Sequence, residues 1–166
     1  IKMIDDSMRG SRIIGMIQPK NNSDNTTNQL YKIGCAGKIT SFNESEDGRY
    51  LVILSGISRF QIMEEVKNEK TYRECIVNFT EFKDDLKNLE NLNNTSDLKK
   101  IFKELKLLFE KRGYIINWND LEKQNPTQII NTLSMASPFT LEEKQMLLET
   151  KSLNLRRIKL EEILKT

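Results

Sequence analysis

Residues 31–62 read YKIGCAGKITSFNESEDGRYLVILSGISRFQI, and this stretch decides the fold. It contains two β-rich runs, residues 31–42 and residues 49–62, on either side of an acidic turn. Asp47-Gly48 in this turn supplies the positive φ angles that a hairpin requires. Glycine inside a strand marks a bulge, a bend or a close approach of backbones, and these runs contain Gly34, Gly37 and Gly56. The stretch therefore predicts a long hairpin in a strongly bent sheet or a small, partly closed barrel.

Two further strands are predicted beside the hairpin. Residues 12–18 form an apolar run that ends at Pro19, and residues 72–79 form another β-rich run. Residues 1–8 have the pattern of the later turns of a helix, so we expect the natural N-terminus to lie upstream of Ile1.

The spacing of apolar residues along the chain changes near Phe82. From Asp97 onward, apolar residues recur at the i, i+3, i+4, i+7 spacing of an amphipathic helix. Further helices are predicted from Asn125-Pro126 to residue 136, from the capping box that pairs Thr140 with Glu143, and from Ser152 onward.

This change in the spacing of apolar residues predicts two structural modules joined by a linker. We expect a β-rich module over residues 1–82, a polar linker over residues 83–96 and a helical bundle over residues 97–166. The fold class is therefore α+β.

Composition excludes several kinds of chemistry. The 166 residues contain no His and only two Cys, so neither a His general base nor an all-cysteine zinc site can form. Cys35 has no His to activate it as a nucleophile, and no glycine-rich phosphate loop follows a strand. We therefore predict no catalytic residue, no cofactor and no metal site, and a chain that is not an enzyme.

Net charge and hydropathy limit the classes of partner and the cellular location that we expect for this chain. The 26 Lys and Arg against 24 Asp and Glu give a net charge of +2, so a nucleic-acid partner is not expected. No apolar run approaches the roughly 18–20 residues that span a bilayer, so we expect no membrane partner. The unpatterned Cys35 and Cys75 fit a reducing cytoplasm, which is the expected location.

An ordered set of motifs resembles the N-terminal substrate-binding domain of the Lon proteases. The set covers most of the chain at compatible spacing: Ile14-Gly15-Met16-Ile17-Gln18-Pro19, Tyr31-x-Ile33-Gly34-Cys35-Ala36-Gly37-x-Ile39, Asp47-Gly48-Arg49-Tyr50, Gly56-Ile57-x-Arg59-Phe60, Pro138-x-x-x-x-Glu143-Lys144-Gln145-x-Leu147-Leu148-Glu149 and Leu153-x-x-Arg156. The resemblance implies a PUA-like pseudo-barrel followed by a helical bundle. It also implies that a first strand precedes Ile1, and that no ATPase or peptidase domain follows, as in free-standing bacterial versions of the domain.

The signature residues are expected to have structural roles. Glycines let strands bend, the Asp-Gly pair forms a turn, small and branched side chains pack inside, and Arg59 pairs with a carboxylate or caps carbonyls across the sheet. The set comprises Gly34, Ala36, Ile39, Asp47, Gly48, Arg49, Gly56, Arg59 and Phe60.

The resemblance implies a domain that binds unfolded or exposed apolar protein segments, working with a protease partner in trans. Such a surface should be an exposed apolar patch or an open sheet edge. The candidates are Met16, Tyr31, Phe42 and Met63. Homo-oligomer formation is left open.

Three alternatives remain at this stage. The first is a PUA-like RNA-binding module, whose RNA affinity would fall with salt. The second is a hydrolase with a nucleophile at Cys35 or Ser55. The third is a small-molecule pocket, as in the related domain of the cereblon family, although the zinc-binding Cys pattern of that family is absent.

Overall fold

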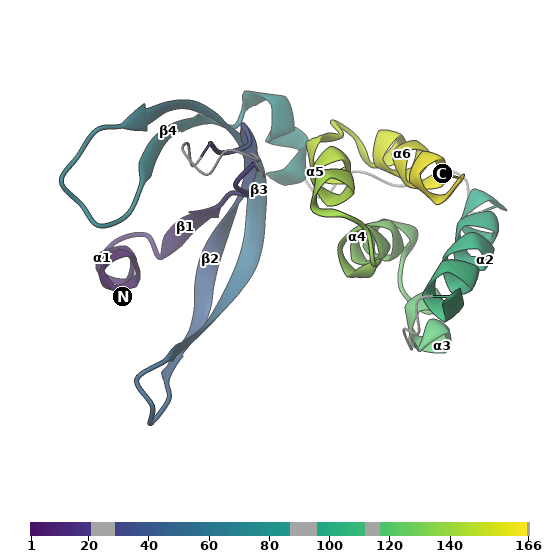
Figure 1. The fold of residues 1–166 in the computed structure, drawn as a ribbon, viewed down its shortest axis with the longest axis horizontal. Coiled ribbons are helices and arrows are strands. Elements are labelled where there is room, and N and C mark those ends of the chain that lie inside the picture. Colours follow the sequence, from purple (N-terminus) through teal and green to yellow (C-terminus); the bar gives the residue numbers. More distant parts are fainter. Residues whose placement is uncertain (21–28, 87–95, 112–116, 166) are drawn as a thin grey trace. The chain divides into compact units, whose positions relative to one another are not determined.

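The computed structural model divides the chain into a β-rich unit, Ile1–Asn88, and a helical unit, Leu89–Thr166 (Figure 1). It describes residues 1–20, 29–86, 96–111 and 117–165. Residues 87–95 of the expected linker lie outside this described part.

An open antiparallel sheet forms the β-rich unit. After helix α1 (Lys2–Met8) come β1 (Ile13–Met16), β2 (Ile33–Glu44), β3 (Tyr50–Val66) and β4 (Glu74–Asn78). The spatial order is β1-β2-β3-β4, so β1 and β4 are the two edges (Figure 1). The α+β fold expected from the sequence is confirmed, and the described strands form an open sheet, not a closed barrel.

The hairpin of β2 and β3 turns at the predicted Asp-Gly pair. Gly48 has a φ of +75°, and the Gly48 N–H donates to the Ser45 carbonyl at 2.9 Å. Arg49 donates from Nε to the Asp47 carboxylate at 2.6 Å, so an exposed side-chain contact joins the two residues that flank Gly48.

Three irregularities interrupt the strand pairing. One residue is extra on β3 between the partners of Ala36 and Gly37, and Thr40 is extra on β2. A third extra residue, Met63, lies on β3 opposite β4. Each bulge bends its strand and increases the local twist.

The ring of Phe60 lies against two glycines of neighbouring strands. A Cβ atom at Gly34 would lie 2.5 Å from the Met16 carbonyl oxygen and 2.7 Å from the Phe60 ring, and one at Gly15 would lie 3.1 Å from that ring. The ring also meets Phe79 edge to face, with centroids 6.2 Å apart. The buried apolar residues of the unit are Ile14, Ala36, Ile39, Phe60 and Phe82.

A short helical segment fastens the end of the β-rich unit to β3. This segment, η1 (Thr80–Leu86), buries Phe82 and contributes Asp85. Arg59 donates to Asp85 from Nε at 2.8 Å and from Nη2 at 2.6 Å. Its guanidinium also lies 4.4 Å from the centroid of the Phe82 ring. Residues 83–86, which the sequence assigned to the linker, are therefore part of η1, and Asp85 among them contacts β3.

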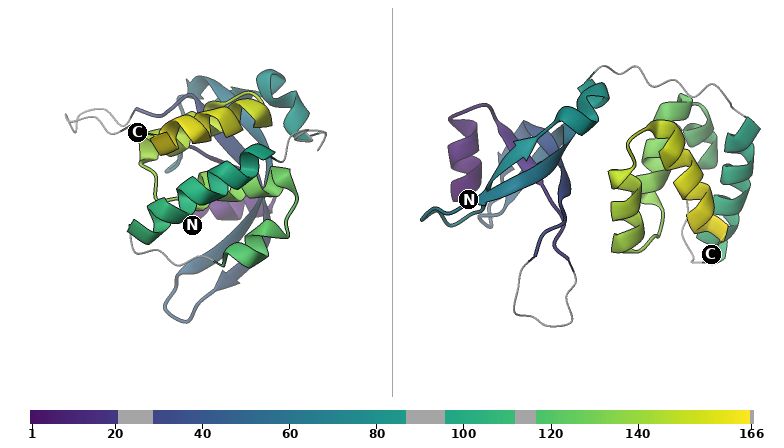
Figure 2. Two further views of the ribbon diagram at one scale, coloured as in Figure 1. Left: turned by 90° about the vertical axis from the view of Figure 1, so that its right-hand side faces the viewer. Right: turned by 90° about the horizontal axis from the view of Figure 1, so that it is seen from above.

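The helical unit has its own apolar core. It contains α2 (Ser96–Lys111), α3 (Trp118–Glu122), α4 (Pro126–Ala136), α5 (Leu141–Glu149) and α6 (Leu153–Lys165), and Figure 2 shows their arrangement. The fully buried side chains of its core include Ile101, Leu105, Ile130, Leu133, Leu147 and Leu160. Within the described ranges, no helix combines the length and apolar character needed to traverse a bilayer.

The predicted helix starts are confirmed by their side-chain caps. Asn125 accepts from the Gln128 N–H at 2.8 Å, and both bonds of the capping box between Thr140 and Glu143 are present. Helix α3 was not expected. Asn117 caps it, and Trp118 at its start packs edge to face on Phe109.

Replacing Gly34 with Ala tests the close packing under Phe60. The new Cβ would overlap a backbone carbonyl that cannot swing away, so we expect a loss of about 1–3 kcal/mol in the stability of the β-rich unit. Gly56→Ala is the matched control, because its Cβ would meet only the Cys35 sulfur at 4.0 Å. The readout is exchange protection of the Ala36 amide, since the single Trp lies in the other unit. Equal losses in both variants would contradict the packing argument.

A double-mutant cycle tests the attachment of η1. Asp85→Ala leaves the Arg59 guanidinium, whose side chain is only 7% exposed, without its carboxylate. We expect this variant to lose roughly 3 kcal/mol in the same exchange measurement. Arg59→Met combined with Asp85→Ala should lose clearly less than the sum of the two single changes. Strict additivity would show that the pair is not coupled.

Candidate functional site

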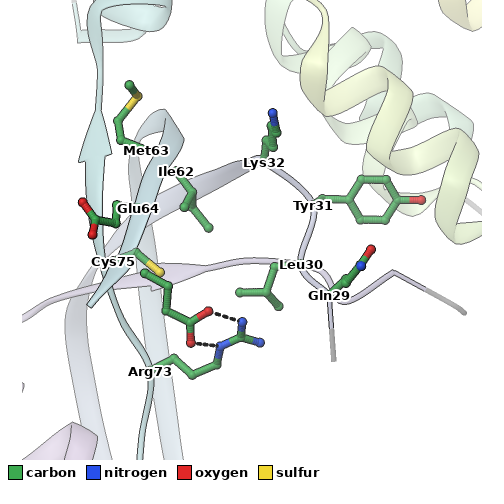
Figure 3. Close-up of a pocket in the computed structure, with 10 residues that line it drawn as sticks. Gln29, Leu30, Tyr31, Lys32, Ile62, Met63, Glu64, Arg73 and Cys75 are labelled. Atoms are coloured by element: carbon green, nitrogen blue, oxygen red, sulfur yellow. Dashed lines mark hydrogen bonds and ion pairs between the residues drawn. The ribbon is translucent and has the colours of Figure 1, made fainter. Parts of the chain in front are cut away.

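An open depression of about 340 Å³ lies between residues 29–32 and the adjoining parts of β3 and β4 (Figure 3). Its lining residues come from three separate parts of the β-rich unit: Gln29, Leu30, Tyr31, Lys32, Ile62, Met63, Glu64, Glu65, Arg73 and Cys75.

The depression exists because the chain before β2 turns away from β3. Lys32 still follows β3, since its carbonyl accepts from the Ile62 N–H at 2.7 Å. The preceding residues pair instead with the end of the β1 segment, where the Tyr31 N–H donates to Gln18 at 3.0 Å and Leu30 bridges to Pro19. Strand β3 continues to Val66. The two segments therefore separate and leave a space between them.

The floor of the depression is apolar. Figure 3 shows Leu30, Ile62 and Cys75 projecting toward the space that they line. The pKa of the Cys75 thiol is raised above its ordinary value. Burial is the larger cause, and the nearby Glu65 charge is the smaller one. The thiol is therefore uncharged at neutral pH and behaves as a small apolar group.

One wall is an ion pair that is largely satisfied within the protein. Arg73 donates to the Glu65 carboxylate from Nε at 2.6 Å, and Nη2 donates to the second oxygen. These hydrogen bonds hold the pKa of Glu65 below its usual range. The wall therefore contributes little net charge, while Lys32 and Glu64 add one cation and one anion to the lining.

Two of the four candidates predicted from the sequence line this depression. Met63 lines it and is 59% exposed at its bulge. Tyr31 lines the opposite side, although its ring extends away from the floor in Figure 3.

The other two candidates lie elsewhere. Met16 is exposed on β1, where it pairs with Cys35. Phe42 stacks on Tyr50 with ring centroids 4.9 Å apart, and it pairs with Val52. At about 3.3 Å per residue, Val52 lies roughly 33 Å along β3 from Ile62. Neither residue lines the depression.

The sequence did not identify Leu30, Ile62, Cys75 or the Arg73–Glu65 pair as parts of a site. Alternation within β4 could have placed Cys75 and Val77 on one face. It could not show which residues of β3 share that face, because the extra residue at Met63 shifts the register by one. The signature residues do not line the depression either. In the part of the chain that the structure describes, no cluster of three or more Cys, Asp or Glu could hold a metal ion.

Comparison with known proteins matches the whole chain to one family model. The model describes the ATP-dependent protease La (LON) substrate-binding domain, and it matches residues 1–166. Among curated proteins, the Lon protease of Flavobacterium johnsoniae is 29% identical over 95% of this chain and 20% of its own length. The Lon protease of Malacoplasma penetrans is 30% identical over 94% of this chain and 21% of its own length. The chain thus spans about a fifth of these relatives.

Solved structures of low sequence identity share the fold. The N-terminal domain of the Mycobacterium avium complex Lon protease matches with a TM-score of 0.58 at 18% identity, covering 98% of this chain and 82% of that one. The Lon N-terminal domain protein from Xanthomonas campestris matches with a TM-score of 0.57 at 13% identity, covering 93% of this chain and 89% of that one.

The environment of Cys75 predicts its reactivity. Because the thiol pKa is raised, less thiolate is present at a given pH, and iodoacetamide should alkylate Cys75 more slowly than the same residue in the denatured chain. Peptide mapping by mass spectrometry across a pH series would measure both rates. The pH midpoint for Cys75 should lie above that of the denatured control. A slower rate with an unchanged midpoint would indicate steric protection in place of burial of the charge.

Proposed function

This chain belongs to the family of Lon protease substrate-binding domains, and on that basis we propose that it binds polypeptide segments at the depression between residues 29–32 and β3. The relatives are much longer proteins, so their activity and substrates are attributed to this chain only as part of this proposal.

The observation that carries the proposal is the combination of an apolar floor with exposed apolar side chains beside it. Leu30, Ile62 and Cys75 offer a surface on which one apolar side chain of a ligand can be removed from water. Met63, which also lines the depression, adds an exposed apolar side chain at its margin. Methionine is flexible and polarisable, so it adapts to different apolar partners. A site of this kind suits exposed segments of many sequences.

We further propose that the chain performs no chemistry on what it binds. The absence of His and the match to a substrate-binding domain support this proposal. The two cysteines form no disulfide with each other in the structure, which is compatible with the proposed cytoplasmic location. The proposed partner is a protease activity, because the curated relatives that this chain matches are Lon proteases.

The RNA-binding alternative has less support. Its best basic cluster, on α6, is occupied by internal contacts, because Arg157 pairs with Glu161 and Lys159 pairs with Glu162. Arg156 donates to the Leu147 carbonyl and to Asn131. These side chains are therefore committed to the helical unit and are poorly placed to neutralise phosphates.

Two exposed apolar residues on the same strand provide a matched test. Met63 at the depression is 59% exposed, and Leu51 in the distal part of β3 is 61% exposed. Binding of a labelled, permanently unfolded polypeptide, such as reduced and carboxamidomethylated ribonuclease A, is followed by fluorescence anisotropy at moderate salt. Met63→Asp should weaken binding about fivefold or more, whereas Leu51→Asp should change it by less than about twofold. The proposal would be contradicted if the unchanged protein did not bind the polypeptide, or if the two variants weakened binding equally.

A further inference from the structure

The proposed site contains a part of β3 that has a neighbouring strand on one side only. Pairing of β3 with β2 ends with Gln61 opposite Ile33, followed by the bond from the Ile62 N–H to Lys32. Pairing with β4 continues to Val66 opposite Glu74. Within the described ranges, residues 63–66 of β3 therefore have no strand on the β2 side.

The direction of the free backbone groups follows from the register. In an antiparallel sheet, the N–H and C=O of successive residues point alternately to the two neighbouring strands. The Ile62 N–H points toward β2. Because Met63 is the extra residue of the bulge, the next residue whose backbone groups point toward β2 is Glu65. Glu65 also lines the depression, so one donor and one acceptor face the proposed site.

The charges on this edge determine which strand fits beside it. Residues 63–66 carry two neighbouring carboxylates, Glu64 and Glu65, of which Glu65 pairs with Arg73. A second copy pairing here in antiparallel fashion would bring acidic residues against acidic residues, which is unfavourable. Acidic side chains on an edge hinder self-association in this way. A strand with neutral or basic side chains meets no such repulsion, and a basic residue near Glu64 would be favoured.

We propose that the depression binds its substrate by strand addition. An extended segment without proline pairs with the backbone of Glu65, places one apolar side chain on Leu30, Ile62 and Cys75, and carries a basic residue near Glu64. This inference rests on the proposed function and narrows it, because the main chain of the substrate now contributes directly. Helical and proline-rich segments of equal hydrophobicity are then poor ligands, since they offer no free row of N–H and C=O groups.

The test uses the acetylated and amidated heptapeptide Lys-Thr-Val-Phe-Val-Thr-Lys as the probe, with three forms measured by anisotropy against the unchanged full chain. One form has free amides, and the other two are N-methylated on alternate residues, in the two possible phases. In strand addition, only one phase removes N–H groups that point at β3. We expect that phase to lose about tenfold or more in affinity and the other phase to stay within about twofold. The Glu65 amide should also exchange more slowly with solvent when the unmethylated peptide is bound.

The outcomes separate this inference from the proposed function. Equal affinities for the three peptides, or equal losses in the two phases, overturn strand addition and leave side-chain binding of polypeptide intact. The same conclusion follows if the heptapeptide does not bind while unfolded ribonuclease A does. Failure of both ligands to bind contradicts the proposed function itself. Proline in place of the central Phe removes both an amide N–H and the apolar side chain, and this peptide should bind no better than the β3-facing methylated form.

Discussion

The contact of the Phe60 ring with Gly15 and Gly34 is the constraint on which the rest of the β-rich unit depends. It requires two positions without side chains on two different strands, so it fixes β1, β2 and β3 relative to one another. Because strand side chains alternate, an inward Phe60 sends Arg59 to the other face, where Asp85 and Phe82 receive it. The same alternation returns Ile62 to the face of Phe60, where it becomes part of the floor of the depression. One ring therefore determines both the attachment of η1 and the position of the site.

Local signals in the sequence were sufficient for most of the elements. The Asp-Gly turn, the Asn125 cap and the capping box at Thr140 each depend on a few adjacent residues, and each occurs where it was expected. Helix α3 has only five residues, which is too short for a periodic apolar pattern. Asp85 was overlooked because a carboxylate in a polar run carries no sign of the Arg that it meets from a distant strand. Contacts of this kind depend on tertiary structure.

Sequence reasoning identified only some of the residues that line the candidate site, for the same reason. Met63 and Tyr31 were among the candidates for an exposed apolar patch or open sheet edge, and both line the depression. By the same criterion Met16 and Phe42 were chosen, but one lies on β1 and the other stacks on Tyr50. Met63 and Tyr31 differ from Met16 and Phe42 because they lie where the chain before β2 leaves β3. At this point residues 29–31 pair with residues 18–20. That departure is a property of strand pairing, and composition does not reveal it.

The attachment of η1 also has a mechanical consequence. The chain runs directly from η1 into the segment that leads to the helical unit, so a pull along the chain from that side reaches η1 before it reaches the sheet. The Arg59–Asp85 pair and the buried Phe82 ring hold η1 against β3 at that point. They therefore bear the load first, and residues 62–66 lie further along β3, beyond this anchor. Strand β4, which contributes Cys75 to the depression, precedes η1 in the chain and is loaded only after this anchor gives way.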